Sequence, residues 1–520
     1  MSKFSKVATK KYNHPISADP QIQKTVNFEG GEAFTLPLKQ RLASRLLTSL
    51  VNENNFYGDN TLELLSDINE IAKSDPVFLL KLAAYARNVM YMRSVPIYAL
   101  ANASLINESK PYIRSWTPHI VKRGDEPAEV LAIINSHFTS KNQKPVIPAS
   151  IKKGLADVVS SFNAYTLMKY KGKGNSVNLW DVFNICHPKP STLEQTEVWK
   201  KFMNSELESA NTWEVNISRD GSTKESWEKT IPVMGYMALL RNLRNFIDKE
   251  ISVDSVKFVV SKLTNVEQVK NSKQLPFRFF SAWRELSNSE RLYNLSQNQD
   301  ALTKVFVQAT EQAFDISCSQ VSQLEGITAI FSDHSGSMEQ KISSKSKVTR
   351  KDICMVLHAI ADKKSDANVG LIFGSRIKRV NSQGLSSMRF VEKLLSENVG
   401  HSTDIHLCFN YLIKNNIKVD RIIVLSDMQC YNSFYETATV DSLWNLYRKN
   451  NPNTHLHSVD LAGYGTSMNP ANSPNVHLYA GWTNKFLDLI NYSEKGLSTL
   501  VKEIENYNPN ISQEIEEIEE

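Results

Sequence analysis

The chain of 520 residues exceeds the roughly 250–300 residues at which a single hydrophobic core stops growing, so two or more domains are expected. Hydrophobic residues make up 41% and charged residues 22%, which excludes global disorder, and no apolar stretch is long enough for a membrane span or a secretory signal peptide. The net charge of +5 divides unevenly: residues 1–315 carry 40 Lys and Arg against 32 Asp and Glu, whereas residues 316–520 carry 20 against 23. The basic excess in the first part is a weak indication of nucleic-acid binding.

The region from 36 to 314 has apolar residues at helical spacing, beginning with Leu38, Leu42 and Leu46. Many helices joined by short polar loops favour stacked antiparallel pairs of the HEAT type, although no clean repeat period is visible. Two interruptions, 171–177 and 213–225, are interpreted as exposed loops.

Single residues support this helical interpretation. Asp75 stands between a serine and a proline, the arrangement of a capping residue before the first turn of a helix. Gly154 lies in a helical stretch and predicts a close helix contact. Tyr170 and Tyr236 are interpreted as core residues.

After residue 323 the pattern becomes an alternation of strands and helices, which predicts a parallel, doubly wound α/β domain. The expected strands are short β-branched or aromatic runs at 327–331, 369–373, 421–425, 455–461 and 476–480. The expected helices are 349–364, 386–396, 404–415, 441–449 and 484–506. In such sheets ligands bind beyond the carboxyl ends of the strands.

A cluster of oxygen-bearing residues follows these strand ends. Asp333, Ser335 and Ser337 form a D-x-S-x-S sequence after the first strand, Thr403 precedes a helix, and Asp427 follows another strand. Hydroxyls and carboxylates are the ligands that a hard divalent cation selects, so Mg²⁺ is the expected metal. The alternative is that Asp333 and Ser335 only form a turn or a helix cap.

These five residues resemble the metal-ion-dependent adhesion site of von Willebrand factor A domains, over residues 324–505. The resemblance implies that Ser335 and Ser337 ligate the metal directly, that Thr403 ligates directly or through water, and that Asp333 and Asp427 often act through water. A carboxylate from a partner can complete the shell. His334 replaces the small residue usual in that family. No residue is placed by motif as a general base, and we therefore expect no enzymatic activity.

The helical part resembles the TROVE module of Ro autoantigen proteins, in which a ring of HEAT-like helix pairs precedes a von Willebrand A domain. The strings that carry the resemblance are Asn-Phe-Glu-Gly-Gly-Glu-Ala-Phe at 27–34, Arg-Gly-Asp-Glu at 123–126, Lys-Tyr-Lys at 169–171, His-Pro-Lys-Pro at 187–190, Thr-Trp-Glu at 212–214, the run 227–245, and Leu-Pro-Phe-Arg at 275–278. It implies four segments: a flexible start at 1–20, a helical ring at 21–323, the α/β domain at 324–505 and an acidic tail at 506–520.

In that family the ring holds single-stranded 3′ ends of misfolded or unprocessed noncoding RNA in its hole, small structured Y RNAs bind the outer surface, and some bacterial members tether an exoribonuclease through the RNA. The resemblance therefore implies a cytoplasmic RNA-binding protein, bacterial or phage-encoded, concerned with noncoding RNA quality control. Neither DNA nor a membrane is an expected partner. The candidate RNA contacts are Lys169, Lys171, Lys173, His187 and Lys189 for the outer surface, and Arg241 and Arg244 for the inside of the ring.

Two other functions stay open. In the first, the α/β domain binds an acidic protein through its metal and the ring is only a scaffold. In the second, the metal site hydrolyses a substrate, which the missing base disfavours. The cysteines are odd in number and form no C-x-x-C pair, which indicates free thiols in a reducing compartment and disfavours structural zinc. They are Cys186, Cys318, Cys354, Cys408 and Cys430.

Overall fold

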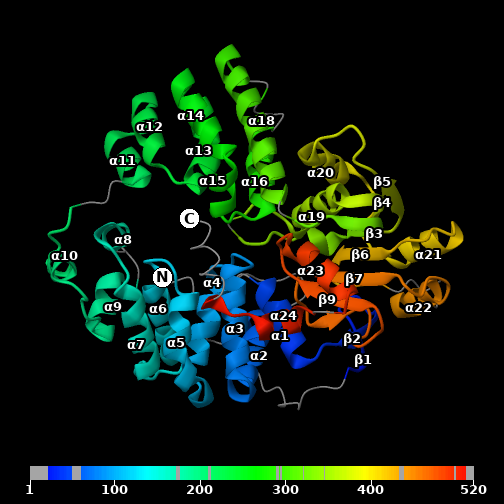
Figure 1. The fold of residues 1–520 in the computed structure, drawn as a ribbon, viewed down its shortest axis with the longest axis horizontal. Coiled ribbons are helices and arrows are strands. Elements are labelled where there is room, and N and C mark those ends of the chain that lie inside the picture. The colour runs from blue at the N-terminus through cyan, green and yellow to red at the C-terminus, as the bar shows by residue number, and fades with distance from the viewer. Residues whose placement is uncertain are drawn as a thin grey trace.

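The computed structural model describes residues 22–49, 60–170, 176–208, 212–287, 292, 295–319, 321–344, 346–431, 438–496 and 499–510. Figure 1 shows the helices from α2 to α18 following one another around an arc, with the α/β domain joining its two ends. The predicted combination of a helical ring and a von Willebrand A-like domain is therefore confirmed. None of the described helices is both long and apolar enough to cross a membrane.

The helices of the helical part run from 6 to 23 residues in length, and most have one buried face. They are α1 (Leu38–Leu47), α2 (Asn60–Ser74), α3 (Pro76–Asn88), α4 (Ser94–Ala103), α5 (Lys110–Ile120), α6 (Glu126–Thr139), α7 (Ala149–Val159), α8 (Ala164–Lys169), α9 (Leu179–Cys186), α10 (Leu193–Met203), α11 (Trp213–Asp220), α12 (Lys224–Thr230), α13 (Tyr236–Asp248), α14 (Val253–Leu263), α15 (Val266–Asn271), α16 (Pro276–Leu286) and α18 (Gln297–Ser319).

Local signals in the sequence explain several of these helices. Asp75 caps α3, because its side chain accepts a hydrogen bond from the Phe78 amide at 3.1 Å. Gly154 lets α7 approach α5, since a Cβ there would lie 2.5 Å from Thr117 Oγ1. The expected loop at 213–225 is wrong: Thr212 accepts a hydrogen bond from the Val215 amide and caps α11.

The α/β domain contains a six-stranded sheet in the order β5-β4-β3-β6-β7-β9. The strands are β3 (Leu324–Asp333), β4 (Ser365–Phe373), β5 (Ile377–Val380), β6 (Arg421–Ser426), β7 (His455–Asp460) and β9 (Val476–Ala480). Neighbouring strands pair in parallel except β5, which pairs antiparallel with β4 at one edge. The five predicted strands are confirmed, and β5 was not predicted.

Helices cover both faces of the sheet. They are α19 (Arg350–Lys364), α20 (Ser387–Ser396), α21 (His406–Lys414), α22 (Val440–Asn450) and α23 (Lys485–Glu494), whereas the following α24 (Leu500–Asn506) packs on α1 and α3. Side chains of one sheet face, such as Ile330 and Ile423, belong to the same hydrophobic core as the helical part. The other face packs on α21 and α22 as a separate core that includes Phe331 and Val424. The predicted helix 484–506 is in fact two helices, α23 and α24.

Both ends of the chain cross between the two parts. A hairpin of β1 (Lys24–Val26) and β2 (Glu32–Thr35) pairs with β8 (Thr466–Ser467) of the α/β domain. At the other end α24 packs on α1 and α3, where Lys39 pairs with Glu505 at 2.7 Å. The arc is thus tied to the α/β domain by terminal segments as well as by the continuous core.

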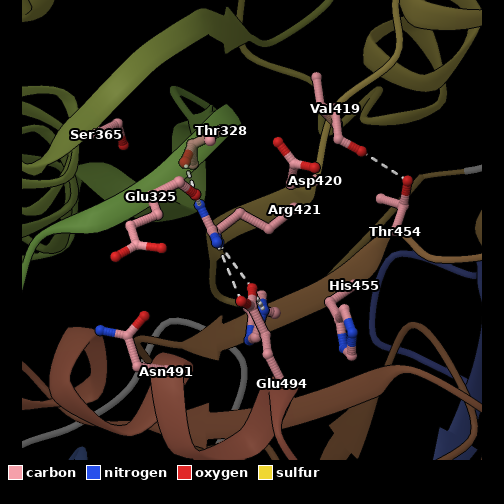
Figure 2. Close-up of polar contacts among 12 residues, drawn as sticks. Glu325, Thr328, Ser365, Val419, Asp420, Arg421, Thr454, His455, Asn491 and Glu494 are labelled. Carbon is pink, nitrogen blue, oxygen red and sulfur yellow. Dashed lines mark hydrogen bonds and ion pairs between the residues drawn. The ribbon is translucent and has the colours of Figure 1, made fainter.

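A buried arginine organises the amino ends of the central strands. Arg421, at the start of β6, donates to both carboxylate oxygens of Glu494 in α23 and to the Glu325 carbonyl and the Thr328 hydroxyl (Figure 2). These contacts lie at the end of the sheet away from the D-x-S-x-S sequence. The carboxyl ends of the strands are therefore left to form the candidate site.

Candidate functional site

The first half of the predicted metal site is the turn that follows β3. Asp333, the last residue of this central strand, accepts a hydrogen bond from the Ser335 amide at 2.8 Å through Oδ1 and from the Ser426 hydroxyl at 2.5 Å through Oδ2. The hydroxyl oxygens of Ser335 and Ser337 lie 3.2 Å apart. The turn thus holds one carboxylate and two hydroxyls in a fixed group.

Two further loops bring the remaining predicted ligands to this turn. The Gly336 amide donates to the His401 carbonyl at 2.8 Å, which places the loop containing Thr403 beside the serines. The Tyr431 amide donates to the Thr403 carbonyl at 3.3 Å, which joins that loop to the segment after Asp427. The five predicted residues, Asp333, Ser335, Ser337, Thr403 and Asp427, are all at most 3% exposed. The structure therefore places them together at the carboxyl edge of the sheet.

The electrostatics of the site favour a cation. Burial, and then the charge of Asp427, raise the pKa of Asp333 to about 7. Burial also raises the pKa of Asp427, and the neighbouring Ser337 hydroxyl and the Arg350 charge oppose that shift. The Oδ2 atom of Asp427 is buried without a hydrogen-bond partner in the described part of the chain. A bound Mg²⁺ would balance both carboxylates and occupy that oxygen, so the donor set fits this ion.

The site differs from metal centres made of imidazoles, thiolates and carboxylates alone. In the described ranges no group of three or more His, Cys, Asp or Glu side chains is placed to hold a metal, so any cation here depends on the serine and threonine hydroxyls. The Nε2 atom of His334 contacts the Leu394 carbonyl at 3.1 Å, so this nitrogen is occupied by a backbone contact. Burial lowers the pKa of His334 to about 4.

The predicted outer RNA contacts lie around α8 and α9. Lys169, at the end of α8, is exposed and sits over the rings of Tyr165 and Tyr170, 5.5 and 5.6 Å from their centroids. His187 ends α9 in a left-handed conformation with φ of +49°, and both His187 and Lys189 are exposed. Lys171 and Lys173 lie outside the described residues. Tyr170 is only half-buried, so the prediction that it is a core residue is wrong.

The predicted inner contacts lie on α13, in a different part of the arc (Figure 1). Arg241 and Arg244 are both exposed, whereas the adjacent Leu240 and Leu243 are buried. Arg244 donates to Glu285 of α16 at 2.9 Å, so this arginine also joins two helices. The structure therefore separates the two predicted sets of RNA contacts.

Comparison with known proteins identifies the family. A sequence model of the TROVE domain matches residues 38–206 and 201–364, which together cover more than half of the chain. The chain belongs to the TROVE domain family.

Relatives and solved structures agree with this assignment. The chain is 22% identical to telomerase protein component 1 of Mus musculus over 360 residues and 23% identical to that of Rattus norvegicus over 358 residues. These regions are 53% and 54% of this chain but only 13% of either relative. The crystal structure of the Deinococcus radiodurans RO (RSR) protein superimposes with a TM-score of 0.60 and 16% identity, covering 89% of this chain and all of that one. This last likeness shows the shared fold.

The structure of this TROVE protein adds residues that the sequence did not single out. Arg123 is exposed and sits over the Tyr170 ring at 5.5 Å, so it extends the group formed by Tyr165, Lys169 and Tyr170. We call these four residues the tyrosine–cation cluster. They come from two segments 40 or more positions apart, and although the strings at 123–126 and 169–171 carry the family resemblance, nothing in the sequence predicted that Arg123 lies over Tyr170.

Proposed function

We propose that this TROVE protein binds RNA, and that the tyrosine–cation cluster is part of the binding surface. The observation that carries the proposal is the exposure of this cluster: Tyr165 is 49% exposed and Lys169 and Arg123 point their charges over the rings. Exposed rings stack on unpaired bases, and lysine and arginine contact phosphates. His187, at the end of α9, and Lys189, just after it, are also exposed, and they offer a further ring for stacking and a further positive charge for phosphate contacts.

The finer functions follow from the family resemblance. We propose that the outer surface binds a small structured, Y RNA-like RNA and that single-stranded 3′ ends of noncoding RNA contact the face of α13 with Arg241 and Arg244. The protein would then act in noncoding RNA quality control in the cytoplasm, with an exoribonuclease as a partner tethered through the RNA. We propose no catalytic activity for the chain itself, because the buried His334 is turned toward the Leu394 carbonyl instead of toward the serines.

The second candidate function, adhesion to an acidic protein through the metal, is favoured by the unpartnered Asp427 oxygen. The two functions differ in their response to salt and to EDTA. We expect RNA affinity, measured by fluorescence anisotropy with a labelled stem-loop, to fall steeply between 50 and 200 mM KCl because phosphate contacts release counterions. The stem-loop must first be shown to fold without magnesium. EDTA should then leave the RNA affinity unchanged. Binding that is insensitive to salt and lost in EDTA would favour adhesion and contradict RNA binding through phosphates.

We also propose that Asp333, Ser335, Ser337, Thr403 and Asp427 bind Mg²⁺. A ligand that binds only the folded protein stabilises it in proportion to RT ln(1 + [L]/Kd). We therefore expect millimolar Mg²⁺ to raise the thermal midpoint of the full chain above its value in EDTA, and Asp333→Ala to remove the increase. An identical wild-type midpoint in Mg²⁺ and in EDTA would contradict the proposal.

A further inference from the structure

A cavity lies between two helices of the arc and the segment that follows α24. Its volume is about 580 Å³, within the roughly 300–1,000 Å³ of small-ligand pockets. One wall consists of Lys81 on α3 and of Ser115, Trp116 and His119 on α5, and the other wall is the segment 505–510. None of the described residues proposed above as RNA contacts or metal ligands lines this cavity.

The wall from α5 presents an aromatic ring and an imidazole. Trp116 is half-buried, and its ring meets the His119 ring edge-on with the centroids 6.1 Å apart. The Asn88 side-chain amide donates to the His119 carbonyl at 3.0 Å and to the Ala84 carbonyl at 2.8 Å, which fixes the end of α5 against α3. Burial, and then the charge of Lys122, lower the pKa of His119. The ring is therefore neutral at pH 7, with one donor and one acceptor nitrogen.

The opposite wall alternates anchoring residues with carboxamides. Tyr507 packs edge-on against Tyr85 of α3 with the centroids 5.6 Å apart, and Pro509 is buried. The residues beside them, Asn506, Asn508 and Asn510, are exposed. The Asn510 backbone amide donates to Asn508 Oδ1 at 3.1 Å. Tyr507 and Pro509 thus hold the segment on the arc, and its asparagine side chains bring hydrogen-bond donors and acceptors to the cavity.

The charges around the cavity permit a phosphate at its edge. Glu505 is the one carboxylate among the described lining residues, and it pairs with Lys39 at 2.7 Å. The Lys81 ammonium donates to the Glu505 main-chain carbonyl, which is a neutral group, so this contact does not cancel its positive charge. The cavity therefore combines a cation with an aromatic ring and neutral hydrogen-bonding groups.

Unpaired bases are recognised by stacking on aromatic rings and by hydrogen bonds to their edges, for which asparagine and neutral histidine provide both donors and acceptors. We propose that this cavity binds an unpaired nucleobase of RNA. The base stacks on Trp116, His119 and the asparagine side chains bond its edge, and the adjoining phosphate lies near Lys81. The inference rests on the proposed RNA binding. It adds a contact separate from the tyrosine–cation cluster and from α13, and it makes the segment after α24 part of the RNA-binding surface.

Fluorescence anisotropy of a short, labelled, unstructured RNA with the full chain tests the assignment. We expect Trp116→Ala to weaken the affinity about tenfold, within the effect of losing one base–aromatic stack, and Trp116→Phe to keep most of it because a ring remains. Tyr492→Ala is the matched control, since this aromatic side chain on α23 is 55% exposed and does not line the cavity. Circular dichroism first shows which variants are folded.

A second variant tests the cavity even where Trp116→Ala does not fold. Asn506→Ala combined with Asn510→Ala changes only exposed residues, and we expect it to weaken the RNA affinity about fivefold, the effect of losing one hydrogen bond. A 4-thiouridine in the same RNA should crosslink, on irradiation of the wild-type complex, to α5 or to the segment 505–510. Mass spectrometry of the digested protein locates the crosslink.

The outcomes separate this inference from the proposed function. If the wild type binds no RNA, both fail. If it binds RNA but folded Trp116→Ala and the asparagine double variant bind as tightly, the cavity assignment is wrong and RNA binding stands. Binding of AMP or UMP that Trp116→Ala abolishes, with no change in RNA affinity, would assign the cavity to free nucleotides and would also overturn its role in RNA binding.

Discussion

Three histidines occupy neighbouring positions on the last two strands of the sheet. His455 and His457 lie on β7 and His477 on β9, with the His457 and His477 rings stacked at 4.8 Å and a hydrogen bond of 2.9 Å between His455 and His477. Burial lowers the pKa of all three, and that of His477 to about 3. Glu494 opposes this shift and Arg421 adds to it at His455 and His457. The folded protein therefore keeps these rings neutral.

We expect this group to make the protein less stable in mild acid. A histidine with a lowered folded pKa contributes its full stability above the unfolded value near 6.5 and loses it as the pH falls below that value, because the unfolded chain binds the proton. Asp333 titrates in the opposite direction, so the test is the difference between wild type and His477→Gln in saturating Mg²⁺. Between pH 6.5 and 5.5, we expect the free energy of unfolding by urea to fall by about 1 kcal/mol more in the wild type than in His477→Gln. Parallel pH profiles for the two proteins would contradict this.

The residues of the proposed metal site could be brought together from the sequence because they are polar residues at the ends of buried strands. Asp333, Ser335 and Ser337 are close in sequence, and the strand pattern places Asp427 at the same edge of the sheet. The contact of the 27–31 turn with this edge of the sheet could not be predicted in the same way. Its partner loop is about 400 positions away, and no periodicity connects the two segments.

Helix packing at the element scale depends on a few close approaches, of which α5 against α7 is the clearest. Replacing Gly154 by alanine would improve helix propensity by about 1 kcal/mol. The new Cβ would nevertheless lie 2.5 Å from Thr117 Oγ1 and 2.7 Å from Thr117 Cβ, and Thr117 is fully buried. We expect the clash to outweigh the propensity, giving a net loss of roughly 1–3 kcal/mol.

Chemical denaturation of Gly154→Ala measures this loss. Gly235→Ala is the matched control, because a Cβ there meets no atom within 4 Å. Combining Gly154→Ala with Thr117→Ala should recover part of the loss by removing two of the three clashing atoms. A Gly154→Ala variant as stable as wild type would show that α5 and α7 can move apart at no cost.

Elements with a strong apolar pattern could be predicted from the sequence, and weakly patterned ones could not. The strands β3, β4, β6, β7 and β9 of the main sheet are largely buried runs, so their positions follow from composition, whereas the edge strand β5 is mostly exposed and was missed. The β1 strand is mostly exposed and forms only by pairing with β2, which in turn depends on β8. The helix α11 was missed because its mixed, polar sequence hides the capping residue Thr212.

In the whole molecule, segments from both ends of the chain join the helical part to the α/β domain. The hairpin at 24–35 pairs with β8, and α24 packs on α3, where Tyr507 contacts the edge of Tyr85 at 5.6 Å. The order of a helical part and an α/β domain could be predicted because the spacing of apolar residues changes near residue 323, from a helical pattern to alternating strands and helices. The closure could not, because it depends on contacts between segments at opposite ends of the chain.

Two groups of exposed basic residues lie in different parts of this closed fold, and we propose a different RNA for each. We expect Lys169, His187 and Lys189 to contact structured RNA and Arg241 and Arg244 to contact single-stranded 3′ ends. Each lost phosphate contact should lower the slope of log affinity against log salt by roughly 0.7–0.9. Lys257→Ala, which removes an exposed charge on α14, controls for the change in net charge.

The most direct test is the binding of one stem-loop RNA, with and without a single-stranded 3′ tail, to these variants over a range of KCl concentrations. Circular dichroism and thermal denaturation must first show that they stay folded, since Arg244 also pairs with Glu285. We expect the triple alanine variant of Lys169, His187 and Lys189 to bind the tail-less RNA more weakly and with a shallower salt slope, and Arg241→Ala with Arg244→Ala to weaken tailed RNA selectively. Equal effects on both RNAs, or none in folded protein, would contradict the account.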